Sequence, residues 1–180
     1  NDLGLPYAGV DLVVCPQLLP IYPEIVGDNR GLFGPTYFLL TGKLRKRVVQ
    51  KKPIREVARR ILVVLGGSTT RSTVDALIMV LGDIVGAGRS VLVILGFDSE
   101  ASDKQIATIT GLGVRLIGAT EDIGQYIEWC DIALSASGYL KYEIAALGTP
   151  AILVSIVEHQ EELGKHFTKK TEAARYSGSL

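Results

Sequence analysis

The sequence is poor in the residues that build metal and thiol sites, with two cysteines, two histidines, one tryptophan and one methionine among 180 residues. Cys15 and Cys130 are far apart and fit neither a zinc-ligand nor a CxxC spacing. His159 and His166 make a weak metal site by themselves, although His159 is a candidate for ligand contact. We therefore expect no metal and no cofactor, and the cysteine usage favours a reduced, cytoplasmic setting.

Net charge and long hydrophobic runs are also absent. Lys and Arg balance Asp and Glu at 19 each, which excludes a global field for polyanion binding but not a local patch. The longest apolar stretch, at 145–157, contains Gly148 and Pro150 and is shorter than the roughly 20 residues of a membrane span. No starting Met and no basic region followed by an apolar core are present, so no signal peptide is predicted. We expect the chain to be a piece of a longer protein.

Several catalytic motifs are missing. The glycine turn at 66–69 lacks the Lys of a P-loop and the third Gly of a dinucleotide fingerprint, which argues against ATP hydrolysis and NAD binding. Ser135 or Ser137 could join His159 in a hydrolase triad, but no GxSxG elbow is present. The chemistry must therefore be sought elsewhere in the chain.

The apolar pattern indicates an α/β fold. Hydrophobic residues make up 47% of the chain and mean hydropathy is +0.29, which is typical of one globular core. Apolar runs without alternation predict buried strands at 61–65, 91–95, 114–117, 131–134 and 151–157. Helical patterns fall between them at 74–85, 99–110, 123–130 and 139–147, and a last helix carries both histidines. This order predicts a Rossmann-like parallel sheet with helices on both faces.

Right-handed crossovers place the carboxyl ends of all parallel strands at one rim of such a sheet. The loops expected at this rim are 66–70, 97–98, 118–123, 135–139 and 155–160. Any ligand is expected there.

The most informative stretch is 131–160, which predicts strand, small-residue turn, helix and strand. Ser137 and Gly138 would lie at a helix N-terminus, where backbone N–H groups attract an anion. Glu143, one turn later, could accept hydrogen bonds from two ribose hydroxyls, so the pair suits a nucleotide. The alternative is that Glu143 is a solvated helix residue, because such turns occur throughout α/β proteins.

The first third of the chain lacks the regular alternation of strand and helix patterns. Residues 11–15 predict a strand, and the Pro- and Gly-rich segment 16–35 predicts an irregular segment that crosses between two domains. A basic run follows, composed of Lys43, Arg45, Lys46, Arg47, Lys51, Lys52, Arg55, Arg59 and Arg60, with Glu56 as its one acid. It could hold nucleic acid or an acidic lipid surface, but no aromatic residue interrupts it, so a solvated linker is favoured.

The predicted organisation is a crossing segment with a basic linker at 1–59, packed on a Rossmann-like domain at 60–180. GPTY at 34–37, ILVVLGGS at 61–68 and ASGYLKYEIAALGTPAILV at 136–154, followed by Glu158-His159-Gln160, resemble a known family. These segments look like the C-terminal part of the hydrolases of pseudaminic acid biosynthesis, which remove UDP from a diacetamido-trideoxy-altropyranose. They are also similar to the C-terminal domain of the UDP-N-acetylglucosamine transferase of peptidoglycan synthesis, and both have the GT-B architecture.

The resemblance implies roles for residues of the rim. The diphosphate would lie at Ser137, Gly138 and Tyr139, the ribose at Glu143, the uracil beside Thr120 and Ile123, the sugar facing Glu158, His159 and Gln160, and the interdomain cleft along Gly67 and Ser68. The chain departs from the family pattern at Tyr139, where a small residue is usual. The family's N-terminal half, which carries the histidine thought to activate water, is not in this sequence.

The leading hypothesis is therefore the UDP-sugar-binding half of a nucleotide-sugar hydrolase, with a UDP-sugar ligand and an N-terminal domain of the same protein as partners. No catalytic residue is assigned to this half. Two alternatives stay open. One is the donor-binding domain of a GT-B glycosyltransferase, in which an acceptor replaces water. The other is a non-catalytic nucleotide-sugar-binding or interaction module, which could use the basic run. Nucleic acid is not the expected partner.

Overall fold

The computed structural model describes residues 10–22, 30–48 and 52–180. The chain forms two compact units, one up to Leu40 and one from Thr41 to Leu180. The larger unit thus includes the whole of the basic run. The division into a crossing segment and a binding domain at residue 60 stays a prediction.

The smaller unit contains two short parallel strands, β1 (Leu12–Cys15) and β2 (Arg30–Phe33), followed by the 3-10 turn η1 (Pro35–Tyr37). The strand predicted at 11–15 is confirmed. The expectation of irregular chain throughout 16–35 is wrong at β2, because pairing with β1 supplies hydrogen bonds that local composition does not reveal. The ladder ends where the Gly34 N–H donates to the Cys15 carbonyl at 2.9 Å.

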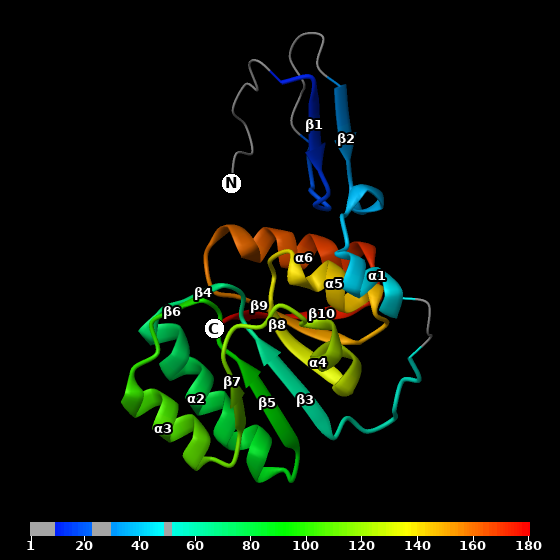
Figure 1. Cartoon of the computed structure of the whole chain (residues 1–180). Helices are drawn as coiled ribbons and strands as arrows, with labels where there is room; N and C mark the ends of the chain where they lie inside the picture. The colour runs from blue at the N-terminus through cyan, green and yellow to red at the C-terminus, as the bar shows by residue number, and fades with distance from the viewer. Residues whose placement is uncertain (1–9, 23–29, 49–51) are drawn as a thin grey trace. The chain divides into compact units, whose positions relative to one another are not determined.

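The larger unit is built on a six-stranded sheet in which all strands are parallel, as predicted (Figure 1). In spatial order the strands are β10 (Ala174–Ser179), β9 (Ala151–Ser155), β8 (Ile132–Ala136), β3 (Arg60–Val64), β5 (Ser90–Ile94) and β7 (Arg115–Ile117). The strand order reverses direction at β3, because the chain builds outwards to β7 and then returns to β8 on the other side. Such a reversal is where open α/β sheets bind ligands.

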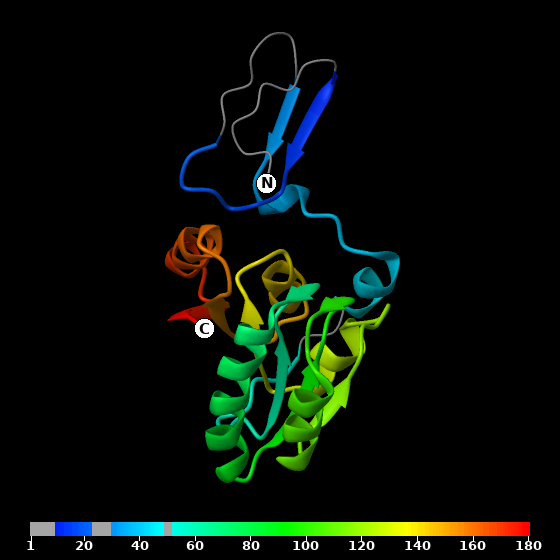
Figure 2. The same ribbon diagram turned by 90° about the vertical axis from the view of Figure 1, so that its left-hand side faces the viewer.

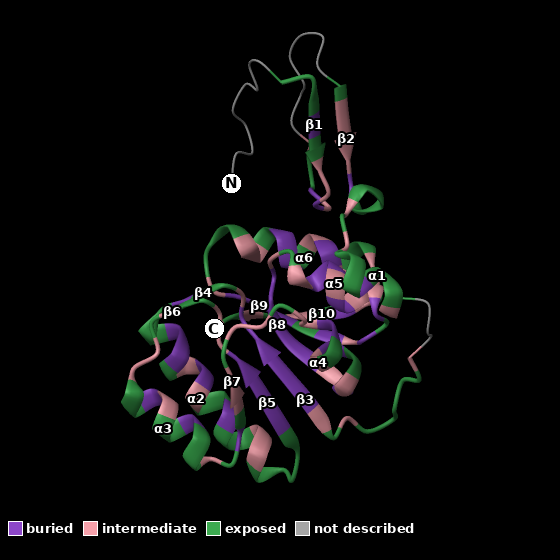
Figure 3. Cartoon of the chain, in the orientation of Figure 1, coloured by how far each residue is buried: buried purple, intermediate pink, exposed green. Residues whose placement is uncertain are grey.

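Helices lie on both faces of this sheet (Figures 1 and 2). Right-handed crossovers assign α2 (Arg71–Gly86) and α3 (Asp103–Gly111) to one face. They assign α4 (Gly124–Trp129), α5 (Leu140–Ala146) and α6 (His159–Lys170) to the other. The central strands are consequently buried along their length, with Leu62 and Val63 at 0% exposure (Figure 3). The predicted α/β fold class is confirmed.

Boundaries differ from the sequence prediction by a few residues, as at β9, which ends at Ser155 rather than 157, and the two largest differences are one helix start and one additional strand. The helix predicted from residue 99 begins at Asp103, because Ser102 and Gln105 form a capping box and residues 98–99 form β6 instead. The chain also continues beyond α6 into β10, which the sequence pattern did not predict. Its segment ARYSGS has little β propensity, and it is held at the sheet edge by pairing with β9.

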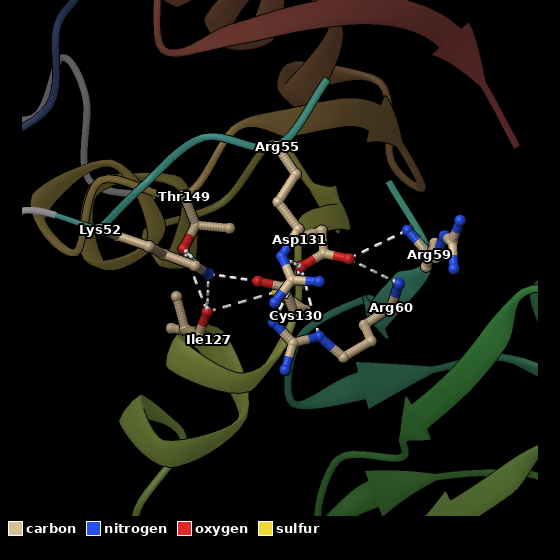
Figure 4. Close-up of polar contacts among 8 residues, drawn as sticks. All are labelled: Lys52, Arg55, Arg59, Arg60, Ile127, Cys130, Asp131 and Thr149. Atoms are coloured by element: carbon tan, nitrogen blue, oxygen red, sulfur yellow. Dashed lines mark hydrogen bonds and ion pairs between the residues drawn. The ribbon is translucent and has the colours of Figure 1, made fainter. Parts of the chain in front are cut away.

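Several side chains of the basic run are bonded to residues around α4 and β8 of the same unit rather than solvated. Arg47, at the end of α1 (Gly42–Arg47), pairs with Asp122 at 2.8 Å and also with Glu128. Lys52 donates to the Ile127 carbonyl at 2.6 Å, to the Cys130 carbonyl and to Thr149 Oγ1 at 2.8 Å (Figure 4). The solvated-linker prediction is therefore wrong for these side chains.

Asp131 is the central acid of this attachment (Figure 4). Its buried carboxylate accepts the backbone N–H groups of Arg59 and Arg60, both at 2.9 Å, and pairs with the side chains of Arg60 and Arg55. Burial by itself would raise the pKa of Asp131, but these hydrogen bonds and the Arg60 charge outweigh it and lower the pKa to about 2. Asp131 is thus a structural carboxylate.

Candidate functional site

One pocket of about 550 Å³ lies at the carboxyl ends of the strands in the larger unit. All five loops predicted at this rim contribute to its lining, including Gly66 to Ser68, Phe97, Thr120, Gly138 and Gln160. The prediction that the loops converge is confirmed. The reason is topological, because all strands of the sheet are parallel and their carboxyl ends therefore lie at the same edge.

The pocket floor depends on the close approach of two backbone segments. β4 (Ser68–Thr69) pairs with β6 (Asp98–Ser99), so the loops after β3 and β5 run side by side. Gly66 has a φ of 100°, which favours glycine. At Gly96 a Cβ would lie 2.1 Å from the Gly67 carbonyl oxygen, so only glycine fits there.

Another part of the lining comes from the end of β8 and the turn before α5, where both serines have buried side chains. Ser137 is 0% exposed, and its hydroxyl donates to the Val154 carbonyl at 3.1 Å. Ser135 is also 0% exposed and donates to the Ala136 carbonyl. Ser135 lines the pocket, but its hydroxyl is bonded to the backbone, as is that of Ser137. Ser137 contributes to the turn through its backbone and is not among the lining residues.

Gly138, Tyr139 and Glu143 do line the pocket. A Cβ at Gly138 would have Gln160 Nε2 as its nearest neighbour, at 3.9 Å, so the space above this residue is open. Tyr139 is 51% exposed. Glu143 is half-buried on α5, and this burial raises the pKa of its carboxyl group. The alternative that Glu143 is a solvated helix residue does not describe this environment.

The three residues predicted to face the sugar separate in the structure. Gln160 lines the pocket, and its Oε1 accepts the Ile156 N–H at 3.1 Å. Glu158 and His159 are exposed at the start of α6 and are not among the lining residues. The Gln160 hydrogen bond to Ile156 joins the two ends of the loop between β9 and α6. It holds the Gln160 side chain at the pocket, where those of Glu158 and His159 are absent.

Gly67, Ser68, Thr120 and Ile123, the other predicted site residues, line the pocket from the loops after β3 and β7. Thr120 Oγ1 accepts the Asp122 N–H at 3.2 Å and so shapes its own loop. The roles that the resemblance implies for them stay predictions.

Sequence reasoning missed two features of the site. Phe97 lines the pocket while remaining 81% exposed, so its ring is available to a ligand. Its position after a buried strand placed it at the rim, but no role was predicted. Lys141 is fully buried beneath the turn that precedes α5, and the available signal was a lysine at an apolar position of the helix.

The electrostatics of the pocket are unusual for a site expected to take a diphosphate. Among the described lining residues Glu143 is the one charged side chain, and none is Lys, Arg or His. The donors at the pocket surface are therefore uncharged, namely backbone N–H groups and the side chains of Ser68, Thr120, Tyr139 and Gln160. Within the described ranges, no three His, Cys, Asp or Glu side chains are grouped to hold a metal ion. None of the described helices is long and apolar enough to cross a membrane.

The parallel sheet flanked by helices has the fold of a GT-B domain. It is similar to a crystal structure of MurG from Acinetobacter baumannii, with a TM-score of 0.53 and 16% identity over 93% of this chain and 46% of that one. In sequence, the chain is 25% identical over 153 residues to the spore coat polysaccharide biosynthesis protein SpsG of Bacillus subtilis, covering 83% of this chain and 44% of SpsG. No family model matches. The chain thus spans less than half the length of these two proteins.

Proposed function

We propose that this chain is the UDP-sugar-binding half of a nucleotide-sugar hydrolase. The observation that carries the proposal is the convergence of five loops on one pocket, with Glu143 beside the Gly138 turn. In the proposed complex the diphosphate lies against the backbone of Gly138 and Tyr139, and Glu143 accepts the ribose hydroxyls. The sequence likeness to a polysaccharide biosynthesis protein supports a nucleotide-sugar ligand over other nucleotides.

The hydrolytic step requires a group that this pocket does not supply. Water attack at the anomeric carbon needs a general base within hydrogen-bond reach of the water. The described lining offers Glu143 as its one ionisable carboxylate, and the proposal assigns that group to the ribose. The base is therefore proposed to come from an N-terminal domain of the same protein, while this half stabilises UDP as the leaving group.

Calorimetric titration with UDP, with UMP and ADP as controls, tests the binding proposal. UDP-selective binding is expected, because the proposed complex has the diphosphate at the Gly138 turn and the uracil beside Thr120 and Ile123, all of which line the pocket. Equal affinity for ADP would overturn the uridine assignment. No binding of UDP, together with binding of an anionic polymer, would favour the interaction module that the basic run suggests.

The glycosyltransferase alternative shares this half and differs in what attacks the sugar. It is tested in the full-length protein by incubation with a UDP-sugar in the absence of any acceptor. Release of UDP with formation of free sugar is expected for the hydrolase. Release that requires an added sugar or lipid acceptor would replace the hydrolase with a transferase.

A further inference from the structure

Lys141 carries a charge in a place where a soluble domain rarely accepts one. Its side chain is 1% exposed, among the most completely buried in the described chain. Its Nζ lies 4.7 Å from the centre of the Tyr142 ring and 5.7 Å from that of Phe167. Burial lowers the pKa of this lysine to about 8. No charged partner contributes to the shift, so the ammonium is not retained for an ion pair.

The hydrogen bonds of Lys141 are directed at the pocket wall. Nζ donates to the Ser137 carbonyl at 2.8 Å and to the Gly138 carbonyl at 3.0 Å. These carbonyls belong to the two consecutive peptide groups that form the turn before α5. Of the residues they connect, Gly138 and Tyr139 line the pocket.

Because peptide groups are planar, the hydrogen bonds from Lys141 to the two carbonyls also fix the direction of the N–H groups in the same peptides. In a trans peptide the N–H points opposite to the C=O of the same group, and none of the described peptide bonds is cis. Because the carbonyls of Ser137 and Gly138 point at the ammonium, the N–H groups of Gly138 and Tyr139 point away from it. The lysine thus sets which side of the turn offers donors.

We propose that Lys141 is a positioning residue, whose buried ammonium holds the Ser137 to Tyr139 turn with its N–H groups directed at the ligand. The inference rests on the proposed function for the identity of the ligand, a nucleoside diphosphate, but not for the contact itself. It also accounts for how a pocket without a lining cation accepts an anion, because the positive charge lies one peptide layer behind the surface.

Few other titratable groups surround Lys141. Tyr142 is its neighbour on α5, and Glu143 follows on the pocket side. The buried face of α6 consists of Leu163, Gly164 and Phe167, none of which titrates, with Tyr176 of β10 behind Gly164. Burial raises the pKa of Glu143 and lowers that of Lys141 to about 8, so the side-chain signals of Lys141 itself are needed to assign a transition near pH 8.

The first arm of the test uses the ligand-free chain and needs no variant. NMR would follow the Lys141 side-chain signals and the backbone amides of Gly138 and Tyr139 from pH 6.5 to 9.5. The turn amides are expected to titrate together with the lysine, near pH 8. Turn amides that stay constant while Lys141 titrates would overturn the proposal.

The second arm compares UDP affinity in wild type, Lys141→Met and the control Lys165→Met. Lys165 also carries a charge near an aromatic ring, but it is exposed on α6 and pairs with Glu161. UDP affinity is expected to fall about tenfold in Lys141→Met and to stay within about twofold in Lys165→Met. Wild-type affinity should also decline from pH 7 to pH 9 more steeply than that of Lys141→Met, since ligand ionisation is common to both.

Equal losses in the two variants, or identical pH profiles, would overturn the positioning role. Wild type that fails to bind UDP at every pH would instead overturn the proposed function. The amide titration would then still decide whether Lys141 holds the turn, so the two failures are distinguishable.

Discussion

The backbone of Gly67 occupies the space that a side chain on Gly96 would need. A Cβ at Gly96 would lie 2.1 Å from the Gly67 carbonyl oxygen and 2.4 Å from that of Gly66. The loops after β3 and β5 can therefore lie side by side only while residue 96 has no side chain. This contact sets the floor of the pocket.

Gly96→Ala is expected to lower the free energy of unfolding by about 2 kcal/mol or more, because the obstructing atoms are backbone and cannot rotate away. It should also weaken UDP binding by displacing Gly67 and Ser68. Urea unfolding and calorimetry measure the two effects. Gly118→Ala is the control, since a Cβ there meets nothing within 4 Å. A Gly96→Ala protein as stable as the control would contradict the described floor.

Gly138→Ala should separate folding from binding. A Cβ at this position would have no protein atom closer than 3.9 Å, so the melting temperature is expected to stay the same or rise slightly. UDP affinity should fall about tenfold, because the methyl group would occupy the space through which the diphosphate approaches the backbone. Unchanged affinity by calorimetry would remove the turn from the ligand site.

Glu143→Gln should weaken UDP binding about 10- to 100-fold, the expected loss when hydrogen bonds to a charged group are replaced. The same change should not reduce stability at neutral pH. Because burial raises the pKa of Glu143, the folded state binds the proton more tightly than the unfolded state. The contribution of Glu143 to stability is therefore present at pH values below its ordinary pKa of 4.5 and is lost as pH rises through the raised pKa of the folded state. The variant has no ionisable group at this position and lacks that loss.

The control for this prediction is Glu158→Gln, which changes an exposed carboxylate that does not line the pocket. Thermal melts and calorimetry on both variants give the comparison. A loss of affinity in Glu158→Gln as large as that in Glu143→Gln would mean that Glu158 contacts the ligand. The start of α6 would then have to move on binding.

Asp131→Asn should destabilise the larger unit by about 3 kcal/mol, because it leaves buried donors of Arg59 and Arg60 facing a neutral amide. The pKa of Asp131 is lowered to about 2 from an ordinary 3.8, so its stabilisation is present above pH 4 and is lost as pH falls towards 2. Urea unfolding between pH 2 and 6 should show this loss in wild type and a flatter profile in the variant.

Glu121→Gln is the matched control for Asp131→Asn. Glu121 is 91% exposed and pairs with Lys43 at 3.7 Å, a geometry in which solvent screens most of the interaction. Its change should alter stability by less than about 0.5 kcal/mol. Equal effects from the two variants would mean that Asp131 does not fasten the basic run.

The sequence by itself determined the fold class and the rim. Runs such as 61–65 and 91–95 have no alternation because both faces of a parallel strand are buried. The parallel direction of the strands then places the loops that follow them at one edge. The position of Gly138 and Glu143 at the rim followed from the same pattern, because both lie shortly after the end of a strand.

Only the tertiary structure decided the details that depend on distant partners. It removed Glu158 and His159 from the pocket lining, buried the Ser137 hydroxyl against Val154, and fastened the basic run through Asp131. It also revealed β10, whose pairing with β9 overrides its weak propensity. Local pattern records which residues avoid water, whereas hydrogen bonds between segments up to 97 positions apart, as from Lys52 to Thr149, exist only once the chain has folded.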